Sequence, residues 1–266
     1  MVVAVVQMKC VTYDKEENFS IAAELIEKAL EKKAKLIILP ELFNTGYCST
    51  ERDWELSEKA GGETEKFLRN YAEKYDCSLI GGFVEKADIS GLVYNSLMLV
   101  SKGKTPEIYR KIYLWGPEKN RFLKGKDLMN WDVSGISVSP KICYEAGFSE
   151  NAKIAALSGS EVLVYSSAFG AARLYAWDLA TKARALETGC YVLASNHSSV
   201  EADIAFCGHS RIVDPMGNVI CETTKDNDVV VADIDLEKVY KQRDALPYLR
   251  DIDTELVVKG YENIDK

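Results

Sequence analysis

A cysteine follows a short run of β-type residues in the stretch Ile136-Ser137-Val138-Ser139-Pro140-Lys141-Ile142-Cys143-Tyr144-Glu145. Residues 148–159 then predict a helix. A strand that ends in a cysteine and turns into a helix presents the thiol at the edge of a sheet, next to free backbone N–H groups. Such a thiol can act as a nucleophile. The alternative is a buried structural cysteine, because free cysteine is among the most buried residue types.

The N-terminal part of the chain predicts an α/β fold. Residues 2–8 and 34–40 are short apolar runs typical of strands, and residues 14–32 carry apolar side chains at helical spacing. A strand–helix–strand unit of this kind favours parallel strands in an α/β layer fold. No linker rich in proline, glycine or serine interrupts the 266 residues, so we expect a single domain over residues 1–266.

The remainder of the chain also alternates between helical and extended patterns. Helices are expected over residues 62–75, 148–159, 173–188 and 236–243. Strands are expected over residues 78–85, 93–101, 161–166, 190–195, 205–214, 219–222 and 229–234. The tail to Lys266 is expected to be polar and extended, and its apolar residues 256–258 could dock on a partner subunit.

Composition argues against several classes of function. The net charge is −8, from 33 basic and 41 acidic residues, so we expect no nucleic-acid partner. The seven cysteines lack the spacing of a zinc site or a disulfide framework. This pattern is typical of a reducing compartment, and we expect a cytoplasmic protein without a metal. We recognise no signal peptide, and no apolar run reaches membrane-spanning length.

Two charged residues follow predicted strands far from Cys143 in the sequence. Glu41 comes directly after residues 34–40, and Lys111 ends a β-type run among aromatic residues. In α/β folds, functional groups gather at the C-terminal ends of strands. The alternatives are a capping or surface glutamate and an ordinary surface lysine. Glu118, in the loop after Lys111, could reach the same cleft or pair with a neighbouring basic residue.

If these strands are neighbours, then Glu41, Lys111 and Cys143 converge at one edge of the sheet. A nearby lysine favours the thiolate and lowers the pKa of the thiol, and a carboxylate can take the thiol proton as a general base. The lysine can also stabilise the oxyanion of a tetrahedral intermediate, together with the backbone N–H of the residue after the nucleophile. The three residues therefore predict covalent catalysis without histidine.

Three blocks carry a resemblance to a known family, namely Leu39-Pro40-Glu41, Arg110-Lys111-Ile112-Tyr113-Leu114-Trp115 and Ile142-Cys143-Tyr144-Glu145. In this order and spacing, they resemble the signature blocks of the nitrilase superfamily of carbon–nitrogen hydrolases. Further agreement comes from Arg184-Ala185-Leu186-Glu187, Gly208-His209-Ser210 and Asp214-Pro215-Met216-Gly217. The likeness spans nearly the whole chain, from Val2 to about Asp235.

The resemblance implies a nitrilase-like αββα four-layer sandwich, with two mixed sheets flanked by helices and commonly assembled as a homodimer or higher homo-oligomer. It implies Glu41 as general base, Lys111 as oxyanion stabiliser and Cys143 as nucleophile. Glu118 would position the substrate beside the lysine, and the N–H of Tyr144 would complete the oxyanion hole. Such enzymes form a thioester, release ammonia or an amine, and hydrolyse the thioester with water. No metal or organic cofactor is implied.

Departures from the family pattern narrow the substrate. Tyr144 stands where true nitrilases usually have tryptophan, and this favours an amidase. The omega-amidase branch usually carries arginine at the position of Gly147, so we do not expect recognition of a substrate carboxylate there. Arg173 could bind an anionic substrate group, or it could be a solvated arginine at a helix start. The pocket candidates are Tyr47, Trp115, Tyr144, Phe169 and His197.

The expected function is therefore that of an amidase, which converts a small aliphatic or aromatic carboxamide to a carboxylic acid and ammonia through a thioester at Cys143. Hydrolysis of an N-carbamoyl compound or of a nitrile by the same three residues is the first alternative. A non-catalytic binding protein with the same fold is the second.

Overall fold

The computed structural model describes residues 1–264. Its strands are β1 (Val2–Met8), β2 (Leu36–Ile38), β3 (Ser78–Lys86), β4 (Val93–Ser101), β5 (Glu107–Arg110), β6 (Trp131–Val133), β7 (Ile136–Ile142), β8 (Val162–Ser167), β9 (Tyr191–His197), β10 (Val200–Glu201), β11 (Ile204–Ala205), β12 (Ser210–Val213), β13 (Val219–Thr223) and β14 (Asp228–Asp233). Its α-helices are α1 (Lys15–Glu31), α2 (Asp53–Leu56), α3 (Glu63–Tyr75), α4 (Ser149–Leu157), α5 (Leu174–Thr188), α6 (Glu237–Ala245), α7 (Tyr248–Asp251) and α8 (Thr254–Ile264).

Strands β10 and β11 form a separate two-stranded sheet, and the other strands form two mixed sheets of similar design. One has the order β5-β4-β3-β2-β1-β14, and the other has the order β6-β7-β8-β9-β12-β13. In each sheet the inner strands pair in parallel and the outer strands pair antiparallel. A short parallel pairing of Gln7 with Asn196 and of Met8 with His197 joins the two sheets, so that hydrogen bonding runs without interruption from one to the other.

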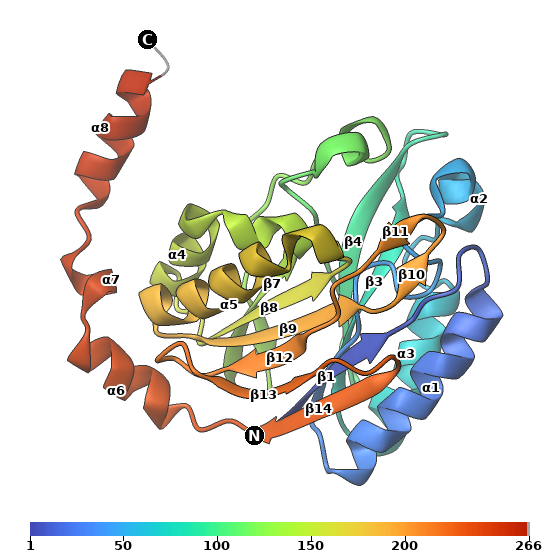
Figure 1. Ribbon diagram of the computed structural model, residues 1–266, viewed down its shortest axis with the longest axis horizontal. Coiled ribbons are helices and arrows are strands. Elements are labelled where there is room, and N and C mark those ends of the chain that lie inside the picture. The colour runs from blue at the N-terminus through green and yellow to red at the C-terminus, as the bar shows by residue number, and fades with distance from the viewer. Residues whose placement is uncertain (265–266) are drawn as a thin grey trace.

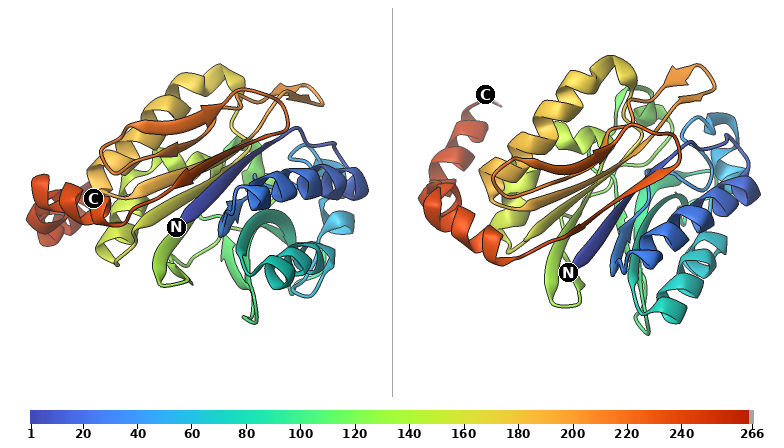
Figure 2. Two further views of the ribbon diagram at one scale, coloured as in Figure 1. Left: turned by 90° about the horizontal axis from the view of Figure 1, so that it is seen from below. Right: turned by 60° about the horizontal axis from the view of Figure 1, so that its bottom comes forward.

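Helices cover the outer face of each sheet, and this confirms the expected αββα layers (Figures 1 and 2). Strand β1 is buried on both faces: Val3 and Val5 pack between the sheets, whereas Ala4 and Val6 pack in the outer layer with Leu25 of α1. Helix α3 shares that outer layer, and α4 and α5 cover the second sheet. The apolar periodicity of the sequence therefore translates directly into two outer cores and one inner core.

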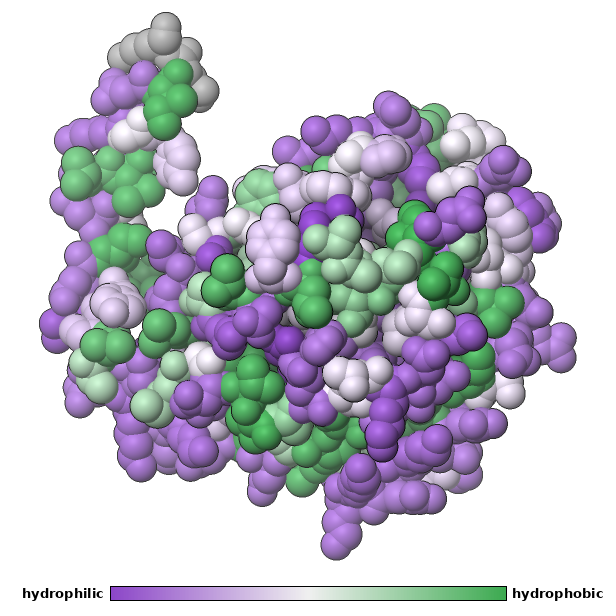
Figure 3. Space-filling view, in the orientation of Figure 1, coloured by the Kyte–Doolittle hydropathy of each residue, from purple (hydrophilic) through white to green (hydrophobic). Residues whose placement is uncertain are grey.

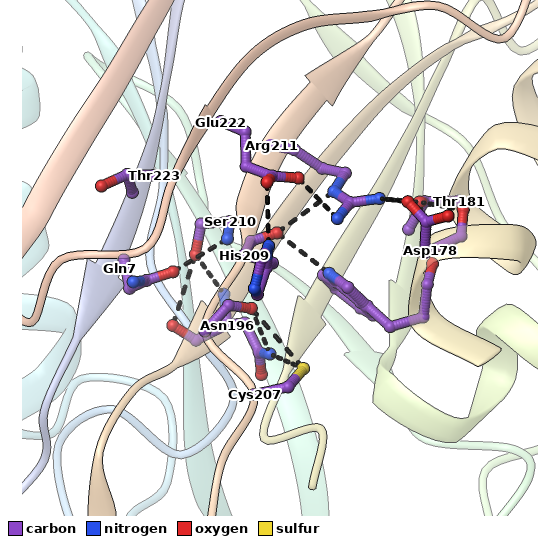
Figure 4. A network of polar contacts seen from close by, with 12 residues as sticks. Gln7, Asp178, Thr181, Asn196, Cys207, His209, Ser210, Arg211, Glu222 and Thr223 are labelled. Atoms are coloured by element: carbon purple, nitrogen blue, oxygen red, sulfur yellow. Dashed lines mark hydrogen bonds and ion pairs between the residues drawn. The ribbon is translucent and has the colours of Figure 1, made fainter. Parts of the chain in front are cut away.

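A polar network holds the sheets together where β1 meets β9 (Figure 4). Oε1 of Gln7 accepts the backbone N–H of Ser210 at 2.8 Å, and the Ser210 hydroxyl accepts the backbone N–H of Asn196 at 2.9 Å. Arg211, only 2% exposed, extends the network to α5 through a 2.8 Å contact with Asp178. Buried polar groups that are paired in this way fix the relative position of β1, β9, β12 and α5.

Two predictions of local structure were wrong. Only residues 210–213 of the expected strand over 205–214 pair as β12, because Gly208 and His209 have positive φ angles of 63° and 53° that interrupt the extended backbone. The tail is helical rather than extended: α6, α7 and α8 form an arm whose end stands clear of the body (Figure 1). Lys266 lies outside the described residues.

The end of the arm presents apolar side chains to solvent. No residue of α8 is buried, and Leu256, Val258 and Ile264 are among its exposed apolar residues (Figure 3). Docking of residues 256–258 on a partner subunit stays a prediction, as does the homo-oligomer. Within residues 1–264, no helix is both long and apolar enough to cross a bilayer.

Candidate active site

Glu41, Lys111 and Cys143 meet at one edge of the sandwich, as the strand-end argument predicts. Glu41 follows the extended segment after β2, Lys111 follows β5, and Cys143 follows β7. The Lys111 ammonium donates to Oε1 of Glu41 at 2.7 Å, and both side chains are completely buried. The charges of both residues act on the Cys143 thiol. Residues that are far apart in the sequence thus form one electrostatically coupled group.

Two further contacts orient the Glu41 carboxylate. Oε1 accepts the side-chain amide of Asn95 at 2.7 Å, and Oε2 accepts the backbone N–H of Ala168 at 2.8 Å. Asn95 belongs to β4, and Ala168 directly follows β8, so both sheets hold this carboxylate. Sequence reasoning missed both residues. Asn95 is a completely buried asparagine in a mainly apolar strand, and that mismatch is the signal that could have drawn attention to it.

Glu118 reaches the same cleft. Its Oε1 accepts from the Lys111 ammonium at 2.9 Å and from the Tyr47 hydroxyl at 2.8 Å, and its Oε2 accepts the backbone N–H of Trp115. The alternative pairing with a neighbouring basic residue is not formed, since Arg121 pairs with Asp53 instead. Lys111 is therefore shared by two buried carboxylates.

Burial alone would disfavour the charge on Lys111, but Glu41 and Glu118 outweigh it and raise the pKa of the ammonium well above its ordinary value. A lysine held in this way stays cationic throughout the neutral pH range. It provides a fixed positive charge beside the thiol, which is the requirement for stabilising a developing oxyanion.

The Cys143 thiol is less acidic than its neighbourhood in the sequence suggests. Burial, followed by the negative charge of Glu41, raises the pKa of the thiol well above its ordinary value, and Lys111 offsets only part of this rise. The expected lowering of the thiol pKa is therefore wrong in net direction. A neutral thiol at rest needs a base in order to become a nucleophile.

Cys143 lies in a sharp turn at the end of β7. The residue begins a 3₁₀ turn over Cys143–Gly147 and has a φ of 48°, a left-handed value that costs energy for a residue with a side chain. Helix α4 begins only at Ser149. The predicted passage from strand to helix thus contains a sharp turn, with the thiol at its first position.

Glu145 fixes the relative position of the lysine segment and the cysteine turn. Its carboxylate accepts the backbone N–H groups of Ile142 at 2.7 Å and of Ile112 at 2.8 Å, together with the hydroxyl of Tyr109. Ile142 precedes Cys143, and Ile112 follows Lys111. One completely buried side chain therefore bridges the backbones that carry these two residues. The sequence showed Glu145 as part of a signature block but gave it no role.

Four of the five predicted pocket residues line one cavity together with Cys143. The cavity walls are mainly apolar and aromatic, and its lining residues are Tyr47, Trp115, Cys143, Tyr144, Gly147, Ala168, Phe169, Gly170, Arg173, Ala176, Ala180, Ile204 and Phe206. The ring of Trp115 meets that of Tyr144 edge-on at 4.8 Å. The side chain of Asn196 accepts the backbone N–H of Phe169 at 2.7 Å, which connects this wall to the network between the sheets (Figure 4).

His197 is the exception among the predicted pocket residues. It is completely buried and does not line the cavity, because it ends β9 inside the junction between the sheets. Its Nε2 lies 2.5 Å from the backbone carbonyl of Glu41, and its Nδ1 lies 3.4 Å from Glu201. The histidine thus contacts the backbone of Glu41 and not the cavity.

No cluster of side chains suited to a metal ion occurs in the described part of the chain. All seven cysteines are free thiols. The reactive groups beside this cavity are the Cys143 thiol, the two carboxylates and the Lys111 ammonium group, and the Arg173 guanidinium lies in the cavity wall.

Comparison with known proteins assigns the family. The sequence model of the carbon-nitrogen hydrolases matches residues 2–244. The chain belongs to the carbon–nitrogen hydrolases of the nitrilase superfamily. This carbon–nitrogen hydrolase is 35% identical over 248 residues to an omega-amidase of Xenopus tropicalis, with 89% of each chain covered. It is 32% identical over 250 residues to the 2-oxoglutaramate amidase of Bacillus subtilis, covering 92% of this chain and 95% of that protein.

A solved structure supports the assignment of the fold. Saccharomyces cerevisiae Nit3, a member of branch 10 of the nitrilase superfamily, superimposes on this hydrolase with a TM-score of 0.86 and 29% sequence identity. The match covers 93% of this chain and 94% of that one. The αββα architecture is therefore that of the superfamily.

Proposed function

We propose that this carbon–nitrogen hydrolase is an amidase that converts a small carboxamide to a carboxylic acid and ammonia through a thioester at Cys143. The observation that carries the proposal is the buried Glu41–Lys111 pair next to a protonated thiol at the wall of an apolar cavity. The amidase names of two relatives with about a third of their residues identical support the same reaction.

Glu41 acts first as a general base. As Sγ of Cys143 attacks the amide carbon, the Glu41 carboxylate takes the thiol proton, which the raised pKa of the thiol would otherwise retain. The carbonyl oxygen becomes an oxyanion, and the Lys111 ammonium and the backbone N–H of Tyr144 stabilise it. One such donor is typically worth about 2.7–4 kcal/mol of transition-state stabilisation.

The proton on Glu41 then passes to the amide nitrogen, the carbon–nitrogen bond breaks and ammonia leaves, so that the acyl group is bound to Sγ. Water enters the vacated position and gives a proton to Glu41 while its oxygen attacks the thioester carbon. Collapse of this second intermediate breaks the carbon–sulfur bond, releases the acid and returns the proton to the thiol. Glu118 holds Lys111 and Tyr47 in place through both steps.

Ammonia release from a panel of simple amides, omega-amides, N-carbamoyl amino acids and nitriles tests the proposal, with Cys143→Ala as the blank. Turnover of amides that is lost in Cys143→Ala supports it. Turnover restricted to carbamoyl compounds or nitriles would keep the three residues and overturn the substrate class. Activity of Cys143→Ala close to that of the wild type would remove the nucleophile assignment.

A folded protein that turns over no member of the panel would favour the binding-protein alternative. Two cases then remain: an enzyme whose substrate is outside the panel, and a binding protein without turnover. Alkylation of Cys143 separates them, because an inert buried thiol does not react in preference to the other six cysteines. The cytoplasmic location and the homo-oligomer accompany this proposal as expectations from the sequence.

A further inference from the structure

Glu201 is a nearly buried carboxylate in a hairpin that lies outside both main sheets. The hairpin pairs β10 with β11 and follows β9 in the chain (Figure 1). Glu201 is only 4% exposed, and it takes no part in the proposed chemical steps. Charged side chains are rarely buried so deeply unless they are paired, so the partners of this carboxylate indicate what it holds in place.

The Glu201 carboxylate holds the backbone of the segment that carries Tyr47. Its Oε1 accepts the backbone N–H of Cys48 at 2.6 Å and the hydroxyl of Thr12 at 3.1 Å. Its Oε2 accepts the backbone N–H of Tyr47 at 3.1 Å. Hydrogen bonds to an ionised group are shorter and about twice as strong as those between neutral groups. One side chain therefore joins the hairpin to the cavity wall at Tyr47.

His197 holds Glu201 in place from the junction between the sheets. Its Nδ1 lies 3.4 Å from Oε2 of Glu201, and its Nε2 lies 2.5 Å from the backbone carbonyl of Glu41. Both ring nitrogens thus face oxygen acceptors, which suits the imidazolium form because it donates from both nitrogens. The Cys10 thiol also lies beside the ring, with its Sγ 3.7 Å from Nε2. Burial alone would raise the pKa of Glu201, but the hydrogen bond and the charge of His197 outweigh it and hold that pKa below its ordinary value.

The Tyr47 hydroxyl extends this connection to the reactive groups. It donates to Oε1 of Glu118 at 2.8 Å, and the same oxygen accepts from the Lys111 ammonium at 2.9 Å. Lys111 in turn donates to the carboxylate of Glu41 at 2.7 Å. The contacts therefore form a closed ring, which starts at the backbone carbonyl of Glu41 with His197 and returns to the carboxylate of Glu41 with Lys111. Movement of the Tyr47 backbone would shift the oxygen that holds the ammonium.

From these contacts we infer that Glu201 is a positioning residue of the amidase site, which holds the backbone of Tyr47 and thereby sets the position of the Lys111 ammonium through the Tyr47 hydroxyl. The inference deepens the proposed function and rests on it. Glu201 does not line the cavity of Cys143, so it acts without contacting the substrate. A shift of about 1 Å in a catalytic group can cost about 100-fold in rate, so loss of the Glu201 contacts should lower kcat.

The test is a double-mutant cycle, with kcat and KM measured for the amide of the panel that the wild type hydrolyses fastest. Glu201→Gln keeps the size of the side chain, but its NH₂ group would face a donor, because the neighbouring backbone and hydroxyl groups all donate to the carboxylate. Tyr47→Phe removes only the hydroxyl on which the inference depends. Asp203→Asn is the matched control, because Asp203 is an exposed carboxylate at the tip of the same hairpin. Circular dichroism checks that each variant is folded at the assay temperature.

We expect Glu201→Gln to lower kcat about 10- to 100-fold and to change KM by less than about threefold. Tyr47→Phe should lower kcat about 10-fold or more, since it removes a hydrogen bond to a charged group. In the Tyr47→Phe background, Glu201→Gln should cost less than about threefold further, because the connection that it disturbs is already broken. Asp203→Asn should keep the wild-type kcat and KM. A merely structural role of Glu201 would instead give independent losses that multiply in the double variant.

A wild-type kcat in Glu201→Gln, or an equal loss from this substitution with and without the Tyr47 hydroxyl, would overturn the inference and leave the amidase proposal standing. A wild type that turns over no amide would overturn the amidase proposal, and the inference with it. Should Glu201→Gln not fold, Glu201→Asp decides, because it keeps the charge and shortens the side chain by one methylene group. A loss of kcat that disappears in the Tyr47→Phe background supports the inference, and an absent loss or one that persists there contradicts it.

Discussion

The ammonium nitrogen of Lys111 lies 2.7 Å from Oε1 of Glu41, and neither side chain is exposed to solvent. Because Glu118 accepts from the same nitrogen, one buried cation serves two buried carboxylates. Taking such groups out of water is costly, and removal of one partner leaves uncompensated charge in the interior. The arrangement that we propose for catalysis is therefore also one on which stability depends.

Replacement of this cation should destabilise the protein. We expect Lys111→Met to lower the free energy of unfolding by about 3–5 kcal/mol, the usual cost of breaking a buried ion pair. Lys119→Met, at an exposed position in the following loop, should change it by less than about 0.5 kcal/mol. Urea unfolding followed by circular dichroism gives both values. Equally small losses in the two variants would show that the buried carboxylates adjust without their cation.

The role of Glu41 as a base can be separated from its electrostatic effect on the thiol. Its negative charge raises the pKa of Cys143, so its removal would speed alkylation if charge alone mattered. If Glu41 takes the proton from the thiol, Glu41→Gln should instead slow the reaction of Cys143 with iodoacetamide, by roughly tenfold or more, since general-base effects typically reach 10²–10⁴-fold. Mass spectrometry of the modified peptide over time measures the rate.

Glu118→Gln is the matched control for that experiment, because Glu118 also raises the pKa of Cys143 but is not placed to act as the base in our scheme. We expect alkylation in this variant to be at least as fast as in the wild type. Acceleration by Glu41→Gln to the same extent as by Glu118→Gln would limit Glu41 to an electrostatic role.

Glu145 should affect turnover without contacting the substrate. Its carboxylate accepts the N–H groups of Ile142 and Ile112, and an amide NH₂ group in Glu145→Gln would face one of these donors. We expect a loss of about 1–3 kcal/mol in unfolding free energy, the usual penalty for an unsatisfied buried group. We also expect a fall in kcat that exceeds the change in KM. Glu24→Gln, on the exposed face of α1, is the control; a Glu145→Gln enzyme with unchanged kcat would refute the positioning role.

Much of the fold could be predicted because short apolar runs and helical periodicity are local signals. The run over residues 2–8 and the amphipathic pattern after Asp14 became β1 and α1, and Asp14 caps that helix by accepting the N–H of Glu17. The arm was missed although the pattern of α8 is helical. Its apolar residues Leu256, Val257, Tyr261 and Ile264 recur at helical spacing, but the many polar residues between them favoured the interpretation as an extended tail.

The candidate site, too, could be predicted from the sequence only in part. Glu41, Lys111 and Cys143 were recognisable because each follows a strand, and β2, β5 and β7 run in the same direction, so that they end at the same edge. The direction of the Cys143 pKa shift was not predictable, because its largest cause is the burial of the thiol, which the sequence does not show. His197 was misplaced because a side chain at the end of a buried strand can face the pocket or the junction between the sheets, and the sequence does not distinguish the two.

Lys141 offers a prediction that is independent of turnover. It is completely buried two residues before Cys143, and its ammonium donates to the Ser139 hydroxyl and the Pro140 carbonyl without a carboxylate partner. Burial lowers its pKa from 10.5 to about 8, and the more distant Glu145 offsets only part of that shift. The native protein therefore releases this proton at a lower pH than the unfolded chain does.

Between about pH 8 and pH 10.5 the unfolded chain binds more protons at this lysine than the native protein does. The contribution of Lys141 to stability therefore rises with pH across this range, and it is lost again when the pH is lowered from 10.5 to about 8. The shift corresponds to about 3 kcal/mol in total. Lys141→Met should remove this rise. Urea unfolding at about pH 7 and about pH 10 should therefore show the wild type gaining about 2–3 kcal/mol relative to the variant. An unchanged difference between wild type and variant at the two pH values would mean that Lys141 keeps its proton in the folded interior, and that the lone hydroxyl and carbonyl around it stabilise the charge far better than burial opposes it.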